Sequence, residues 1–116
     1  MAASKSSELR LLHIRDEIDG MTSALLGVSF ATYRDSYTLR RAAERAVQIV
    51  SEAAKSLPPE LLAGHSSAPW NAIIGIGNIL RHEYQRIDDR RLCEIVTVHL
   101  PELRPTIIAM IAELKR

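Results

Sequence analysis

The fold is decided by residues 38–57, which read TLRRAAERAVQIVSEAAKSL. Apolar residues recur there every three or four positions, as they do on one face of an α-helix. The members of this apolar stripe are Leu39, Ala42, Ala43, Ala46, Ile49, Val50, Ala53, Ala54 and Leu57. Its alanines permit the close approach of another helix, and Pro58 and Pro59 end the segment. The pattern therefore predicts a long amphipathic helix that packs closely against its neighbours.

The same helical spacing extends along the rest of the chain. It predicts helices over residues 8–26, 38–57, 70–87, 89–99 and 102–115, with one helical turn at 60–63. Gly27 ends the first helix, residues 28–37 form a connector, and Pro101 separates the last two helices. No segment alternates with the period of a strand. The sequence thus predicts an all-α, four- to five-helix up-and-down bundle, a single domain at 8–116 after a disordered N-terminus at 1–7.

Composition restricts the class of protein. Hydrophobic residues make up 47% of the 116 residues and aromatic residues only 4%, so the core must be aliphatic. A net charge of +1 argues against a strong overall field for nucleic acid, although twelve of the fifteen cations are arginine, which suits bidentate phosphate contacts. No apolar run reaches the ~20 residues of a membrane span, so we expect a cytoplasmic protein with no membrane association. The single cysteine, Cys93, excludes an intramolecular disulfide and is expected to be a buried thiol.

Residues 70–87 carry two different stripes. The core-facing stripe consists of Ile73, Ile76, Leu80, Tyr84 and Ile87. A polar stripe consists of Asn78, Arg81, His82 and Gln85, at relative positions i, i+3, i+4 and i+7. Gly75 and Gly77 lie just upstream, and each costs a helix about 1 kcal/mol relative to alanine. That cost indicates the close approach of another helix, a second subunit or a ligand.

Taken alone, these residues leave simpler interpretations open. A single histidine on a helix is usually a surface or packing residue, and Arg81 and Arg86 could pair with neighbouring carboxylates. The glycines could serve packing alone. The four histidines lack the spacing of metal ligands, so no metal and no cofactor are predicted. A helical bundle with an incidental polar face is the minimal interpretation.

Three motifs nevertheless resemble those of the HepT-like family of the HEPN superfamily. Residues 70–84, WNAIIGIGNILRHEY, resemble the signature of that family. Residues 49–55, IVSEAAK, resemble its second-helix motif, which usually reads Ile-Gly-Glu-Ala, and residues 99–103, HLPEL, resemble its closing element. The likeness extends from Leu9 to Leu114, and the order and spacing of the motifs make it specific.

The resemblance implies a compact helical bundle that forms a homodimer. HepT-like proteins are toxins of type II toxin–antitoxin modules and act as metal-independent ribonucleases on an RNA substrate. Their partner is a minimal nucleotidyltransferase antitoxin. Their signature is an arginine, four to six residues, a histidine, and a tyrosine two residues later; His82 and Tyr84 match the last two. In some members the antitoxin adenylylates that tyrosine, which makes Tyr84 the corresponding modification site.

One position departs from this pattern. The family arginine directly precedes the asparagine, and Gly77 stands there in this chain. Arg81 lies one helical turn further along on the same face and is long enough to reach back. The expected site residues are His82, Arg81 and Asn78 as catalytic groups, Glu52 as a supporting group, and Arg40, Arg41, Arg45 and Arg86 as RNA-binding residues.

The missing arginine keeps two alternatives open. The first is a catalytically attenuated dimer that acts as a nucleotidyltransferase- or nucleotide-binding module. The second is a structural interaction protein in which Asn78, Arg81 and His82 are incidental. For an attenuated nuclease, the sequence predicts that Gly77→Arg raises the rate of cleavage.

Overall fold

The computed structural model describes residues 2–83, 85 and 87–116, with side chains from Lys5 onward. These residues form an all-helical bundle without strands. The helices are α1 (Ala2–Leu25), α2 (Phe30–Asp35), α3 (Tyr37–Lys55), α4 (Pro59–Ala63), α5 (Trp70–His82), α6 (Asp89–Glu94), a π-helical turn η2 (Ile95–His99) and α7 (Leu100–Leu114). The predicted fold class is confirmed.

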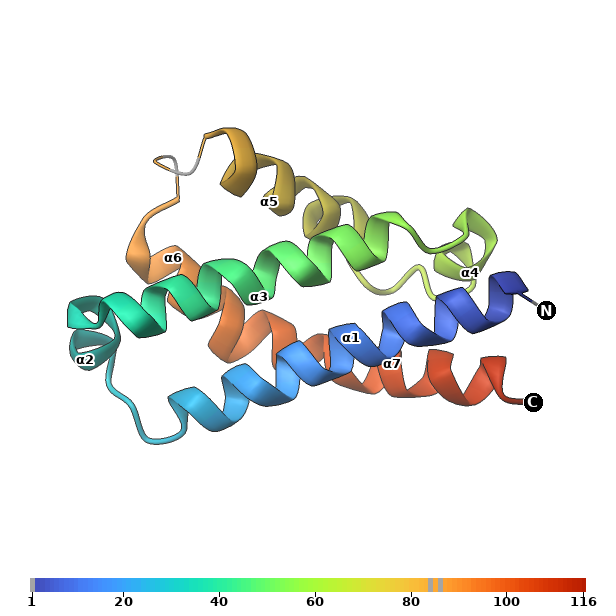
Figure 1. Ribbon diagram of the computed structural model, residues 1–116, viewed down its shortest axis with the longest axis horizontal. Coiled ribbons are helices and arrows are strands. Elements are labelled where there is room, and N and C mark those ends of the chain that lie inside the picture. Colours follow the sequence, from blue (N-terminus) through green and yellow to red (C-terminus); the bar gives the residue numbers. More distant parts are fainter. Residues whose placement is uncertain (1, 84, 86) are drawn as a thin grey trace.

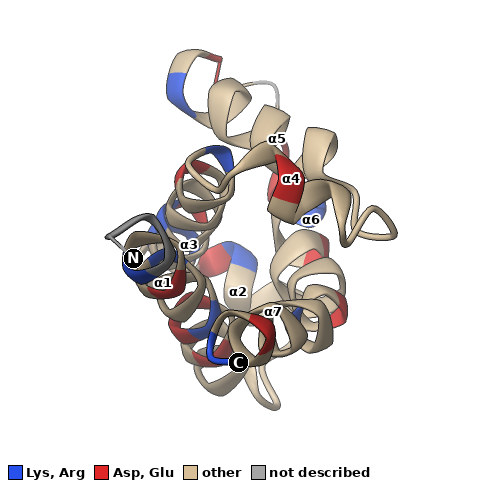
Figure 2. Ribbon diagram, turned by 90° about the vertical axis from the view of Figure 1, so that its right-hand side faces the viewer, with Lys and Arg blue, Asp and Glu red and all other residues tan. Residues whose placement is uncertain are grey.

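The long helices α1, α3 and α7 run along the length of the molecule, with α2 at one end and α4 and both termini at the other (Figure 1). Helix α1 packs against both α3 and α7. Within the described chain, α5 packs extensively against α3 alone. Viewed from the end, α5 therefore lies beyond α3, away from α1 and α7 (Figure 2).

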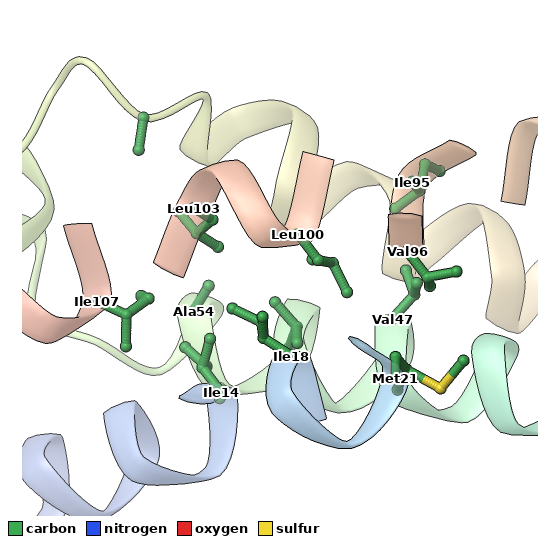
Figure 3. Close-up of a cluster of buried hydrophobic side chains, with 14 of the residues drawn as sticks. Ile14, Ile18, Met21, Val47, Ala54, Ile95, Val96, Leu100, Leu103 and Ile107 are labelled. Carbon is green, nitrogen blue, oxygen red and sulfur yellow. The ribbon is translucent and has the colours of Figure 1, made fainter. Parts of the chain in front are cut away.

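The core is aliphatic, as the composition predicts, and lies between α1, α3, η2 and α7 (Figure 3). Helix α1 supplies Ile14 and Ile18, α3 supplies Val47, and α7 supplies Leu103 and Ile107. All five side chains are at most 5% exposed. Because α3 has buried residues toward both α1 and α5, its position determines where α5 lies.

The first half of the chain differs from the prediction at both ends of α1 and in the connector, and α3 ends at Lys55, two residues earlier than predicted. Helix α1 begins at Ala2, so it includes most of the segment 1–7 that the sequence assigned to a disordered N-terminus. It ends at Leu25, and Gly27 follows with φ 72°, a left-handed conformation that glycine adopts readily. The predicted connector contains α2, whose N-terminus is capped by Ser29: the hydroxyl accepts a hydrogen bond from the Thr32 amide at 3.1 Å.

The second half holds two further differences. The predicted helix over 70–87 ends at His82, two residues after Leu80, which is the last buried residue of α5. The predicted break at Pro101 is wrong: the helix is continuous from Asp89 to Leu114. Its π-helical turn lies just before Pro101 and is closed by the Leu100 amide on the Ile95 carbonyl. A wider turn at this point accommodates a proline that cannot donate a backbone hydrogen bond.

This continuous helix bears on two other expectations. By length and composition alone it is long and apolar enough to cross a membrane, as are the core helices of many proteins, and here its buried face packs on α1.

Cys93 lies in this helix and is half-buried rather than fully buried. Desolvation raises the pKa of the Cys93 thiol above its usual range.

Candidate functional site at the end of α5

Three polar side chains gather on the last two turns of α5. Asn78, Arg81 and His82 are all exposed. The Nη2 of Arg81 donates a hydrogen bond to Oδ1 of Asn78 at 2.8 Å, so the guanidinium is turned back by one helical turn. Arg81 and Asn78 are in contact, as the predicted polar stripe requires, and His82 lies on the same helix end. That Arg81 takes the place of an arginine at position 77 stays a prediction.

The other residues of the two predicted stripes lie partly on α5 and partly beyond its end. Leu80 is buried and Ile73 and Ile76 are half-buried, as the core-facing stripe requires. Gln85 lies beyond the end of α5, so it does not continue the polar stripe. Tyr84 lies outside the described residues, and its predicted modification stays a prediction.

Gly77 faces Ser51 of α3. A Cβ atom built on Gly77 would lie 2.0 Å from Oγ and 2.5 Å from Cβ of Ser51. Ser51 is 4% exposed, and its hydroxyl donates a hydrogen bond to the carbonyl of Ile74 at 2.9 Å. Gly77 is therefore the residue that allows close approach of α3, whereas nothing lies within 4 Å of a Cβ built on Gly75.

This contact leaves no room for an arginine side chain at position 77. A longer side chain there would have to displace Ser51 and separate α3 from α5. Arg81 lies one turn further along, where α5 is exposed, and its guanidinium occupies space near Asn78 without that conflict. The close packing at Ser51 thus fixes the part of α5 that carries the polar cluster.

A hollow of about 440 Å³ lies between α3 and the end of α5, and we call it the α3–α5 hollow. Its lining consists of Arg41, Glu44, Arg45, Gln48 and Leu80. Arg41 forms an ion pair with Glu44, which raises the pKa of the guanidinium. Arg45 takes part in none of the ion pairs between described residues, so its cation is available to a ligand.

The predicted RNA-binding arginines therefore differ in position. Arg41 and Arg45 line the α3–α5 hollow together with Leu80. Leu80 is the residue that precedes Arg81 in the sequence. Arg40 is half-buried, and its Nε points to the Ser36 carbonyl at 3.4 Å, near the start of α3. Arg86 lies outside the described residues.

Glu52, predicted as a supporting group, is exposed on α3 next to Ser51. In the described part of the chain it forms no hydrogen bond or ion pair with Arg81 or His82. Its role stays a prediction.

A larger, mostly apolar groove of about 460 Å³ runs between α5 and the helix that contains α6 and α7. Its lining includes Ile73, Ile76 and Leu103 and also the polar residues His99 and Arg91. None of Asn78, Arg81 and His82 belongs to the lining of this groove or of the α3–α5 hollow, so the polar cluster lies outside both. Across residues 2–83, 85 and 87–116, no three His, Cys, Asp or Glu side chains gather in a group that could hold a metal ion.

Two residues of this region were not predicted as site residues. Ser51 was missed because its partner is on another helix, and its only local signal is a small polar residue within an apolar stripe. Tyr37, the first residue of α3, is 65% exposed, with the Arg41 guanidinium carbon 4.9 Å from its ring centroid. An aromatic residue four positions before an arginine at a helix start is a signal that the sequence does contain.

Comparisons with known proteins point to one family. A family model described as "Ribonuclease HepT-like" matches residues 14–110. The chain is 36% identical over 93 residues to "Putative RNase TTE0752" of Caldanaerobacter subterraneus, which covers 80% of this chain and 83% of that protein. It is 26% identical over 112 residues to "Gamma-glutamylcyclotransferase and putative RNase MJ0434" of Methanocaldococcus jannaschii, which covers 97% of this chain and 50% of the relative. No solved structure matches the chain.

Proposed function

Because the chain belongs to the HepT-like ribonuclease family, we propose that it is a metal-independent endoribonuclease whose active groups are His82, Arg81 and Asn78. The observation that carries this proposal is the hydrogen bond from Arg81 to Asn78, which holds a cation on the exposed helix end that also carries His82. Arg81 thereby compensates for the absence of an arginine at position 77.

The reaction needs a base, an acid and a cation. The ribose 2′-hydroxyl attacks the adjacent phosphorus and loses its proton to a base, the P–O5′ bond breaks, and the 5′-oxygen takes a proton from an acid. The products are a 2′,3′-cyclic phosphate and a 5′-hydroxyl. His82 serves as the base or the acid, since imidazole exchanges protons near neutral pH. Arg81 stabilises the charge on the equatorial oxygens, and Asn78 orients the phosphate.

The arginines of the α3–α5 hollow are a reason to propose RNA as the substrate. Arg41 and Arg45 would hold the phosphates next to the reacting group, and Arg40 and Arg86 would extend this contact. Glu52 would orient His82 or Arg81. A homodimer would bring two polar clusters into one groove, so that the base and the acid come from different subunits.

The following experiment tests the proposed reaction. The purified protein is incubated with single-stranded RNA in EDTA, beside the same RNA with a single 2′-deoxy nucleotide at the cleaved position. We expect cleavage in EDTA, a 2′,3′-cyclic phosphate product, and complete loss of cleavage at the deoxy position, because the internal nucleophile is gone. Cleavage that EDTA abolishes, or that persists at the deoxy position, would contradict the mechanism.

The biological role extends this proposal. We infer that the protein is the toxin of a cytoplasmic type II toxin–antitoxin module and that a minimal nucleotidyltransferase antitoxin silences it by adenylylating Tyr84. With such a partner and ATP, the intact mass is expected to rise by one or more adenylyl groups, and Tyr84→Phe should prevent the increase. An unchanged mass of the wild-type protein would remove this form of silencing.

Gly77 favours one alternative function. Without an arginine at position 77, the chain could bind a nucleotidyltransferase or a nucleotide without cleaving RNA. This alternative predicts that the wild-type protein binds such a partner while RNA stays intact in the EDTA experiment.

A further inference from the structure

The exposed ring of Tyr37 lies at the start of α3, outside the polar cluster on α5. Ser36 caps α3 by accepting a hydrogen bond from the Leu39 amide at 3.1 Å, so the backbone around Tyr37 is fixed. Arg41 lies one turn later, with its guanidinium carbon 4.9 Å from the ring centroid. Glu44 in turn pairs with Arg41 and holds the guanidinium in place. The result is a 65% exposed aromatic ring beside a fixed cation.

Tyr37 also lies in line with the α3–α5 hollow. Residues 37, 41, 45 and 48 are spaced by four, four and three positions, so they follow one face of α3. Eleven residues of helix span about 16 Å. At the far end of this stripe, Gln48 and Arg45 share the hollow with Leu80, the neighbour of Arg81. The stripe therefore leads from the Tyr37 ring into the α3–α5 hollow, where Leu80 is the lining residue from α5.

Its composition fits one class of ligand. Proteins that bind single-stranded nucleic acid combine a basic groove for the backbone with aromatic rings on which unpaired bases stack. Here the stripe offers a ring at one end, guanidinium groups along it, and an amide that can hydrogen-bond a base edge. In a duplex, the base faces are stacked inside the helix and cannot reach Tyr37.

We propose that Tyr37 is a base-stacking residue and that the stripe of Tyr37, Arg41, Arg45 and Gln48 binds single-stranded RNA on its way to the end of α5. This inference rests on the proposed ribonuclease function for the kind of nucleic acid, and it names the single strand as the substrate. It adds a recognition residue outside the predicted site.

The test measures binding of short 2′-O-methyl RNA, which lacks the attacking hydroxyl and stays intact. Fluorescence anisotropy compares the wild-type protein with Tyr37→Leu, Tyr37→Phe and the control Leu26→Ala, which removes a side chain that is 83% exposed elsewhere. We expect Tyr37→Leu to weaken binding about tenfold, while Tyr37→Phe and the control stay within about twofold, because a stacked base depends on the aromatic ring. The wild-type protein should also bind the matching duplex more weakly than the single strand.

A second measurement separates stacking from a general effect on the structure. The same oligonucleotide is made with one abasic position, which is moved along the strand. At one abasic position, the wild-type protein should bind the abasic strand several-fold more weakly than the intact strand. Tyr37→Leu should bind these two strands equally well, because the protein variant has already lost the contact that the abasic position removes. Unchanged affinity of Tyr37→Leu for the intact strand, or equal losses from abasic positions in both proteins, would overturn the inference.

These outcomes are independent of cleavage. A protein that cleaves RNA but binds equally well without the Tyr37 ring retains the proposed function and loses the stacking site. A protein that binds single strands through Tyr37 but leaves cleavable RNA intact retains the stacking site and loses the proposed ribonuclease function.

Discussion

Gly77→Ala is expected to destabilise the protein by about 1–3 kcal/mol, whereas Gly75→Ala, two residues away on the same helix, is expected to stabilise it by up to about 1 kcal/mol. The two substitutions make the same chemical change. They differ in what the new methyl group meets: Ser51 at position 77, and nothing within 4 Å at position 75. Urea unfolding of both variants beside the wild-type protein measures the difference.

The sign at position 77 follows from comparing three effects. Alanine improves helix propensity by about 1 kcal/mol, and this gain is common to both positions. At position 77 the methyl group would lie 2.5 Å from Cβ of Ser51, which side-chain rotation cannot move away. Overpacking of this kind costs about 1–3 kcal/mol, and displacing the Ser51 hydroxyl from the Ile74 carbonyl costs about 1 kcal/mol more. The unfavourable effects therefore exceed the gain.

The same contact changes what Gly77→Arg can report. The sequence predicts a gain in cleavage from this substitution, but the packing at Ser51 leaves no room for an arginine in this chain. We expect Gly77→Arg alone to be less stable than Gly77→Ala. The double variant with Ser51→Gly removes the obstructing side chain, so it should recover much of the lost stability and is the appropriate test of attenuation. Equal stability of Gly77→Ala and Gly75→Ala would contradict the close approach of α3 and α5.

The sequence patterns predicted the features that depend only on residues close together in the sequence. The apolar spacing in 38–57 identified α3 because one face of this helix is buried from Ala43 to Ala54. The clustering of Asn78, Arg81 and His82 followed from their spacing within one helix. Helix α2 was missed because six residues are too few to show periodicity and its start depends on the Ser29 cap.

Features that join distant segments could not be predicted in this way. Ser51 and Gly77 meet because two helices cross at these residues, and neither local pattern contains that information. Pro101 suggested a break because proline interrupts a regular α-helix, yet a π-helical turn before it keeps the helix continuous. The position of the α3–α5 hollow likewise depends on how α5 lies on α3, which only the three-dimensional structure supplies.

His82→Ala is expected to lower the rate of RNA cleavage by about 10²–10⁴-fold, the contribution typical of a general acid or base. His82 is exposed at the last residue of α5, so its removal should leave the unfolding midpoint close to that of the wild-type protein. His13→Ala is the matched control, because His13 is also an exposed histidine on a helix but lies on α1. It should cleave RNA at the wild-type rate.

Single-turnover kinetics with excess protein distinguishes loss of chemistry from loss of binding. The His82 imidazole is proposed to act on the reacting atoms, whereas the contacts in the α3–α5 hollow and at Tyr37 hold the strand. His82→Ala should therefore reduce the cleavage rate at saturating protein and leave the affinity for 2′-O-methyl RNA almost unchanged. Tyr37→Leu should do the opposite, raising the protein concentration needed for half-maximal cleavage without changing the limiting rate. If His82→Ala instead cleaves like the wild-type protein, the polar cluster on α5 is not the catalytic centre, and any cleavage must come from residues elsewhere in the chain.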